Sequence, residues 1–176
     1  MTDRHDPAEA PAPDSPELHA APLLAQLHAF VDQHRDMLLH CADGLTEEEA
    51  RTSLVPSSTT ILGLITHATF VEQVWFGEAV TARSRADLGI VVGPEESFHL
   101  RDEETIRSAT RRYAEAVEAS RRAVRDMGPD TVLPGNRRGP LPLRWVLLHV
   151  LRELAQHCGH ADILREQLLA RRGSRP

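Results

Sequence analysis

The sequence predicts an all-α protein, a four-helix bundle that follows a disordered N-terminal tail. Four long stretches place apolar residues three or four positions apart, which is the spacing of one face of an α-helix. No stretch shows a convincing strand pattern of alternating apolar and polar residues, and no internal repeat is present. With 176 residues, 41% of them hydrophobic, the chain suffices for one domain and is short for two.

Residues 1–21 are expected to be a disordered tail, and residues 22–172 to form the bundle domain. The tail is rich in proline, alanine and acidic residues and has almost no large apolar side chain. Such a segment cannot offset the entropy lost on ordering by burying apolar surface.

The first long helix is expected from about Pro22 to about Ala42. Proline suits the first turn of a helix, and Gly44 follows as a stop. His34 lies on the apolar face of this helix. A short helical segment is expected at 46–50, after a cap-like threonine.

The second long helix is predicted over residues 61–82, after a Pro-Ser-Ser-Thr-Thr segment that offers several N-cap residues. His67 projects at the edge of its apolar face and points toward the core or its mouth. Residues 84–101 show no sustained period and are interpreted as a long connection. Its length leaves room for a crossover or for a wall over a site.

The third long helix is predicted over residues 102–127 and ends at a Gly-Pro pair. Residues 135–142 are interpreted as a turn-rich link, because glycine, proline and asparagine dominate them. The last helix is predicted over residues 143–169, with apolar residues along one side.

Charge and hydropathy exclude two classes of partner. The formal net charge is −6, and the 20 basic residues, all arginine, are spread along the chain. Binding to nucleic acid through phosphate contacts is therefore disfavoured. The sequence contains no run of 18 apolar residues, so no transmembrane helix is predicted, and the N-terminus does not resemble a signal peptide.

The two cysteines, Cys41 and Cys158, each lie on an apolar helical face. This position predicts buried free thiols in a reducing compartment rather than a disulfide. A cytoplasmic location follows as an expectation.

The last helix carries the chemistry-bearing pair Glu153 and His157. Residues four apart emerge from the same face of a helix, so the two side chains are neighbours. A carboxylate against an apolar surface is costly unless a charge or a hydrogen bond satisfies it. A divalent metal would do so, and an arginine from another helix could do so instead.

A lone histidine at the edge of a core, such as His67, is most often a structural residue. Together with Glu153 and His157, however, it gives two imidazoles and one carboxylate from facing helices. Three such ligands with an open fourth position match a catalytic metal site. Structural zinc sites usually have four ligands, often cysteine, and no such cysteine cluster exists in this sequence.

Other histidines compete for the ligand role. His149 precedes Glu153 by four residues, and His160 follows His157 by three. His157 lies deepest in the apolar arc and His149 furthest toward its polar margin, which favours the pair Glu153 and His157. We expect His160, His149 and His34 beside the ligands or facing the substrate, or as ordinary surface histidines.

Residues 56–76 and 143–166 closely resemble the DUF664 branch of the DinB-like superfamily, and the similarity extends over roughly residues 22–170. Relatives include the metal-binding domain of mycothiol-dependent maleylpyruvate isomerase and the bacillithiol and mycothiol S-transferases. The resemblance implies a bundle with up-down-down-up helix order. It also implies a divalent metal, zinc first and nickel or another ion second, held by His67, Glu153 and His157.

The resemblance favours a thiol S-transferase, in which the metal activates a small thiol, mycothiol, for attack on an electrophile. The isomerase has an additional C-terminal domain that it uses with its substrate, and the sequence up to Pro176 does not contain it. Isomerase activity is therefore not expected. Two alternatives stay open: a hydrolase that uses metal-activated water, and a non-catalytic dimeric binding or stress-response module. Expected partners are a small electrophile and a thiol, and homodimer formation is left open.

Overall fold

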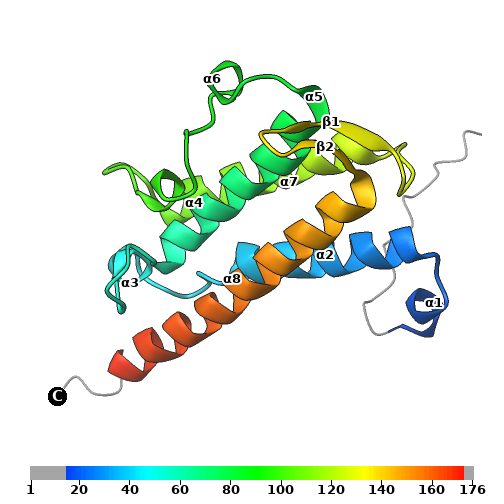
Figure 1. Cartoon of the computed structure of the whole chain (residues 1–176). Helices are drawn as coiled ribbons and strands as arrows, with labels where there is room; N and C mark the ends of the chain where they lie inside the picture. The colour runs from blue at the N-terminus through cyan, green and yellow to red at the C-terminus, as the bar shows by residue number, and fades with distance from the viewer. Residues whose placement is uncertain (1–14, 173–176) are drawn as a thin grey trace, which may run out of the picture.

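The structure, a computed structural model, describes residues 15–172 (Figure 1). The chain is mostly helical, as the sequence predicts. The long helical segments are α2 (Leu23–His40), α4 (Ile61–Glu72), α7 (Ile106–Val124) and α8 (Leu143–Arg172). A π-helical turn, η1 (Gln73–Glu78), and α5 (Ala79–Thr81) prolong α4. Short segments complete the helices: α1 (Pro16–His19), α3 (Glu47–Arg51), α6 (Arg85–Leu88) and the 3₁₀ turn η2 (Glu96–Phe98).

The helices α2 and α8 run in the same direction. The Cys158 thiol lies 3.5 Å from the carbonyl oxygen of His34. About two helical turns further along both helices, Arg165 donates to the carbonyl of Cys41. Residue numbers therefore rise together along both helices (Figure 1).

The helices α4 and α7 run against these two. His67 of α4 lies beside His157 of α8, whereas the later Trp75 lies beside the earlier Trp145. The first amide of α7, at Ile106, donates to Glu47 just beyond α2. Arg121, near the end of α7, binds Asp32 in the middle of α2.

One hydrophobic core lies between the long helices. All of them contribute side chains that are fully or nearly fully buried, and α4 is buried on almost every side. The largest of these are Leu38, Ile61, Leu64, Ile65, Tyr113, Leu143, Leu147 and Leu154. Both cysteines are free and buried, as predicted.

Capping residues explain where several helices begin. Thr60 accepts a hydrogen bond from the amide of Gly63, which confirms the predicted capping segment before α4. Thr46 forms a capping box with Glu49 at the predicted short helix. The third long helix was predicted to start at residue 102, but it starts at Ile106, because Thr105 forms a capping box there.

The expected disordered tail is only partly covered by the structure, since residues 1–14 lie outside the described residues. For residues 16–19 the expectation is wrong, because they form α1. Ser15 accepts a hydrogen bond from the amide of Leu18, and Leu18 is 2% exposed. One buried leucine and a serine cap hold this turn against α2, in a segment otherwise dominated by proline and alanine.

The predicted turn-rich link is a β-hairpin, so the expectation of no strand is also wrong. β1 (Val132–Asn136) pairs antiparallel with β2 (Gly139–Pro142) and places Leu133 opposite Leu141. Prolines cannot donate to a ladder, and three of them in nine residues hide the strand pattern in the sequence. The hairpin continues directly into α8, whose first amide, at Leu143, donates to Thr131.

Replacing Gly135 with alanine is expected to disrupt the hairpin tip. Gly135 has a φ of 92°, and an added Cβ would lie 1.8 Å from the carbonyl oxygen of Gly139. Gly139→Ala is the matched control, because it has a φ of 79° but open space around the added atom. Gly139→Ala should lose about 1–2 kcal/mol of unfolding free energy from backbone strain alone, and Gly135→Ala clearly more, as measured by urea denaturation. Equal losses would contradict the steric argument.

None of the helices in the described chain is both long and apolar enough to span a membrane.

Candidate metal centre

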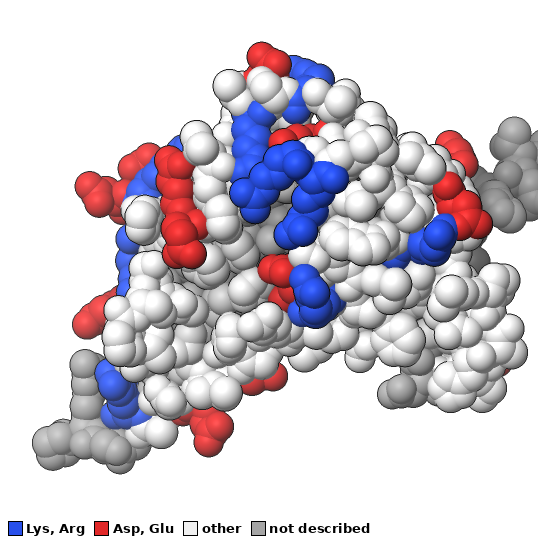
Figure 2. All heavy atoms as spheres, in the orientation of Figure 1, with Lys and Arg blue, Asp and Glu red and all other residues white. Residues whose placement is uncertain are grey.

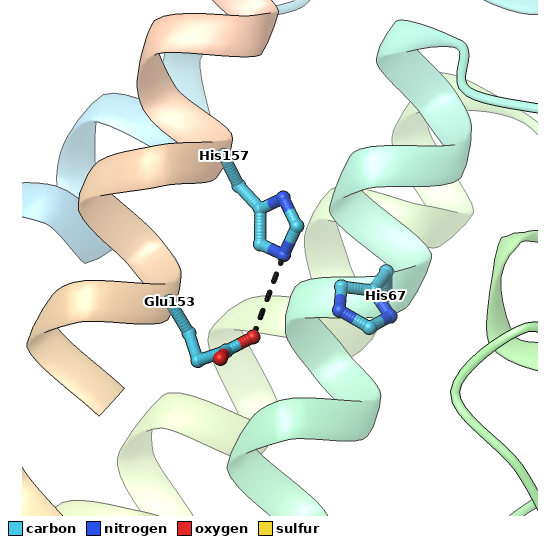
Figure 3. Close-up of side chains that lie close together, drawn as sticks. All are labelled: His67, Glu153 and His157. Carbon is cyan, nitrogen blue, oxygen red and sulfur yellow. Dashed lines mark ion pairs between the residues drawn. The ribbon is translucent and has the colours of Figure 1, made fainter. Parts of the chain in front are cut away.

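Three side chains predicted from the sequence converge at the interface of α4 and α8 (Figure 3). His67 comes from α4, and Glu153 and His157 come from successive turns of α8. One ligand atom from each lies within 4.8 Å of the other two. Within this group, Glu153 Oε2 is 3.9 Å from His157 Nε2. The group is compact enough for the three side chains to share one cation.

The His67 ring is held in a defined orientation by the connection that follows α5. Its Nδ1 lies 2.7 Å from Ser97 Oγ, and the Ser97 hydroxyl donates to the carbonyl of Pro94. Since that hydroxyl proton is already used, Ser97 accepts the Nδ1 proton of His67, which leaves the Nε2 lone pair free. Phe98 stacks on the ring with centroids 4.1 Å apart and an interplanar angle of 13°. The His67 ring is therefore held in an orientation in which its Nε2 lone pair could bind a metal.

His157 has two ring nitrogens that are buried and make no hydrogen bond within the described chain. Its ring meets that of His67 edge to face, with centroids 4.7 Å apart. A buried polar atom without a partner costs roughly 1–3 kcal/mol, so such atoms usually have one. A cation at the centre of the group would partner one of these two nitrogens, Nε2, which lies 3.9 Å from the Glu153 carboxylate.

Burial keeps both imidazoles neutral. It lowers the pKa of His67 to about 3, and the neighbouring His157 lowers it further in the same direction. Burial also lowers the pKa of His157, although Glu153 opposes this shift. Neutral imidazoles offer lone pairs to a metal without first losing a proton.

The metal-free protein should become less stable as the pH falls below about 6.5. There the unfolded chain takes up a proton at His67 that the folded chain, with its pKa of about 3, does not. The unfolding free energy should therefore fall by about 1.4 kcal/mol per pH unit from this residue alone. Urea denaturation in chelator between pH 7 and pH 5 should show a shallower fall for His67→Phe. An identical slope in both proteins would exclude this origin.

Ser97→Ala is expected to weaken metal binding about 10–100-fold, because partners that orient a metal-binding histidine usually contribute that much. The Ser97 hydroxyl is the contact that fixes the His67 tautomer. Ser53→Ala, at an exposed serine of the loop before α4, is the matched control. Competition with a chromophoric chelator gives both affinities, and equal affinities would remove the role given to Ser97.

His149 lies on the far side of the Glu153 carboxylate, with its Nε2 3.8 Å from Oε1. Arg152 donates to its Nδ1, and its ring is packed between Trp75 and Trp145. The sequence places His149 furthest toward the polar margin of the helix. This is wrong: the side chain is buried, because the two tryptophans cover it.

The other two predicted histidines differ in position. His160 is exposed, and its ring centroid lies 5.8 Å from that of His157, so it stands beside the group. His34 points its Nδ1 at the carbonyl of Phe30 in its own helix, at 2.7 Å. It lies neither in the three-residue group nor along the cavity that His67 and Glu153 line.

A cavity of about 170 Å³ opens at the group. Its lining comes from α4 and η1, from the 84–101 connection, from the hairpin tip and from α8. The connection thus forms one wall of a site, as its length suggests. Sequence reasoning missed its helical turns α6 and η2, which are too short to show a period.

Sequence reasoning also missed the π-helical turn η1. It buries three consecutive residues, Val74, Trp75 and Phe76. Such wide turns are rare and often occur at functional sites. The sequence carries no signal for it, because an apolar run such as Trp145-Val-Leu-Leu148 also occurs in the regular helix α8.

Comparison with known proteins assigns the chain to a family. The model of the mycothiol S-transferase family matches residues 26–170, so the chain belongs to that family. This confirms the resemblance to the DinB-like superfamily inferred from the two helical blocks. No curated protein matches the chain.

Proposed function

We propose that this protein is a divalent-metal-dependent mycothiol S-transferase whose metal is held by His67, Glu153 and His157. The observation that carries the proposal is the pair of unpartnered nitrogens on buried His157, beside a His67 whose free lone pair is fixed by Ser97. Family membership supports mycothiol as the thiol.

The donor set favours zinc. Two imidazoles and one carboxylate form the ligand set of several catalytic zinc sites, which keep one position open. Nickel or another divalent ion is the second choice, because imidazole also suits those metals. When bound, such an ion supplies a Lewis acid that lowers the pKa of a coordinated thiol.

The residues of the chain would hold the metal ion and shield it from water. His67 and His157 stay neutral, while Glu153, at 29% side-chain exposure, brings the one negative charge to the open side. Phe98 and Trp75 place apolar surface around the group and limit its access to water. A nucleophilic thiolate gains reactivity where water is excluded.

The nucleophile has to come from outside the chain. Cys41 and Cys158 are buried, and burial raises their pKa values to about 12 and about 11. Thiols of that kind are inert at neutral pH. A small external thiol would lose its proton, form a C–S bond with the electrophile, and release the leaving group.

The helix directions support a DinB-like four-helix bundle in up-down-down-up order. α2 and α8 run one way, and α4 and α7 run the other. We expect the protein in the cytoplasm, where buried free thiols and a reduced thiol cosubstrate coexist.

Elemental analysis and a thiol panel test the proposal. Purified protein should carry about one equivalent of zinc or a related ion, and it should accelerate conjugation of mycothiol to a simple electrophile above the uncatalysed rate. Turnover of an ester in a thiol-free control would indicate a hydrolase instead. Protein that takes up no divalent ion at any tested concentration would indicate a non-catalytic bundle.

A further inference from the structure

Two arginines of the hairpin tip line the metal cavity and have no acidic partner within residues 15–172. Arg137 and Arg138 occupy the turn between β1 and β2 and border the same cavity as His67 and Glu153. Neither forms a hydrogen bond from its guanidinium group or an ion pair with any described residue. Figure 2 shows basic side chains grouped around a hollow on this face of the molecule.

The other arginines near the cavity are already engaged. Arg85 binds Glu78 and the carbonyl of Val92 and lies over the ring of Phe70. Arg152 lies 3.6 Å from Glu153 and donates to His149. Arg137 and Arg138 therefore stand out as cationic groups whose hydrogen-bonding capacity is unused.

The hairpin holds these two residues in a fixed place. Asn136 accepts a hydrogen bond from the amide of Arg138 through its side-chain oxygen, which closes the turn. Leu133 anchors β1 in the core at 1% exposure. The Arg138 guanidinium lies 5.9 Å from the ring centres of both Trp75 and Trp145, so its position is set by two aromatic rings.

The local charge differs in sign from that of the whole chain. The formal net charge is −6, yet three arginines and one glutamate line this cavity. Guanidinium groups recognise carboxylates and phosphates through paired hydrogen bonds. The basic part of this lining, beside the proposed metal site, thus fits a small anion.

We propose that Arg137 and Arg138 bind a carboxylate of the electrophile and aim its reactive carbon at the metal centre; this inference rests on the proposed transferase function. The cavity, at about 170 Å³, is below the range of roughly 300–1,000 Å³ that holds drug-sized ligands. It therefore suits a small organic acid, and Trp75 offers its carbon body an apolar surface.

Iodoacetate and iodoacetamide test the inference, because they differ in charge and share the reacting CH₂–I group. In either reaction the C–S bond forms, the C–I bond breaks, iodide leaves with the bonding electrons, and the thiol proton goes to solvent. The ratio of kcat/KM for iodoacetate to that for iodoacetamide, each corrected for its uncatalysed rate, should fall about tenfold or more in Arg137→Ala/Arg138→Ala. Arg111→Ala, which removes an exposed arginine on α7, should keep the ratio.

Binding of a simple carboxylate, measured without any thiol, tests the arginine site independently of the transferase reaction. Benzoate should raise the melting temperature of the zinc-loaded protein while benzamide does not, and the double arginine variant should lose this shift. An unchanged iodoacetate ratio with active enzyme overturns the arginine site, as does a rise in KM for mycothiol instead of the electrophile. Arginine-dependent benzoate binding without any thiol conjugation overturns the transferase function and its electrophile, and leaves only an anion site.

Discussion

His67→Ala is expected to abolish metal retention and thiol conjugation together. The substitution removes the ligand whose ring is oriented by Ser97 and Phe98, and it leaves only Glu153 and His157 on α8. Loss of an orienting partner alone costs about 10–100-fold in metal affinity, so loss of the ligand should cost more than about 100-fold. Elemental analysis after dialysis should find the variant essentially free of metal.

The helical fold should remain intact in this variant. Many fully buried apolar side chains surround the site, and the far ends of the long helices do not depend on it. Circular dichroism should therefore give an unchanged helical spectrum. His34→Ala is the matched control, because His34 makes no contact with the group and should leave metal content intact. A His67→Ala protein that still holds one equivalent of metal would exclude His67 as a ligand.

Helical periodicity is why the site could be predicted. Residues four apart on α8 had to share a face, whatever the loops did. The ranking of Glu153 and His157 above His149 rested on a polar position of His149 that its burial contradicts, although the three-residue group does not include His149. Local geometry along a helix is fixed by the chain itself, so it can be read from sequence.

Contacts that depend on loops could not be predicted in this way. Ser97 and Phe98 reach His67 from about 30 positions away in the chain, through a segment without a period. The hairpin escaped notice because its prolines conceal the alternation of its strands. Where the chain is irregular, the three-dimensional path decides which residues meet.

The pair Arg35 and Glu72 was likewise missed, and it leads to the second large prediction. Both side chains are almost completely buried, at 3% and 0% exposure. Two parallel hydrogen bonds of 2.8 and 2.7 Å join the guanidinium of α2 to the carboxylate of α4. Asp32 binds the remaining guanidinium nitrogen, and Phe76 lies 5.2 Å from the group's carbon. Here a helix face that the pattern treats as apolar carries a matched ion pair.

Glu72→Leu is expected to lower the unfolding free energy by about 3–5 kcal/mol, because it leaves the Arg35 charge buried without its main partner. Arg35→Met should cost a similar amount by leaving Glu72 unpaired in the core. Urea denaturation of each variant measures these losses. Arg111→Ala breaks an exposed pair on α7 and should change the unfolding free energy by no more than about 0.5 kcal/mol.

The double variant Arg35→Met/Glu72→Leu separates the value of the pair from the cost of breaking it. Desolvation of two buried charges offsets much of their attraction, so an apolar replacement of similar size should be far less harmful than either single change. Asp32 would keep its contact with Arg121 in that protein. Metal content should stay at the wild-type value, since neither residue belongs to the metal group. Losses that simply add would show that the two charges are not coupled, and a loss of metal would show that the pair also sets the position of α4 at His67.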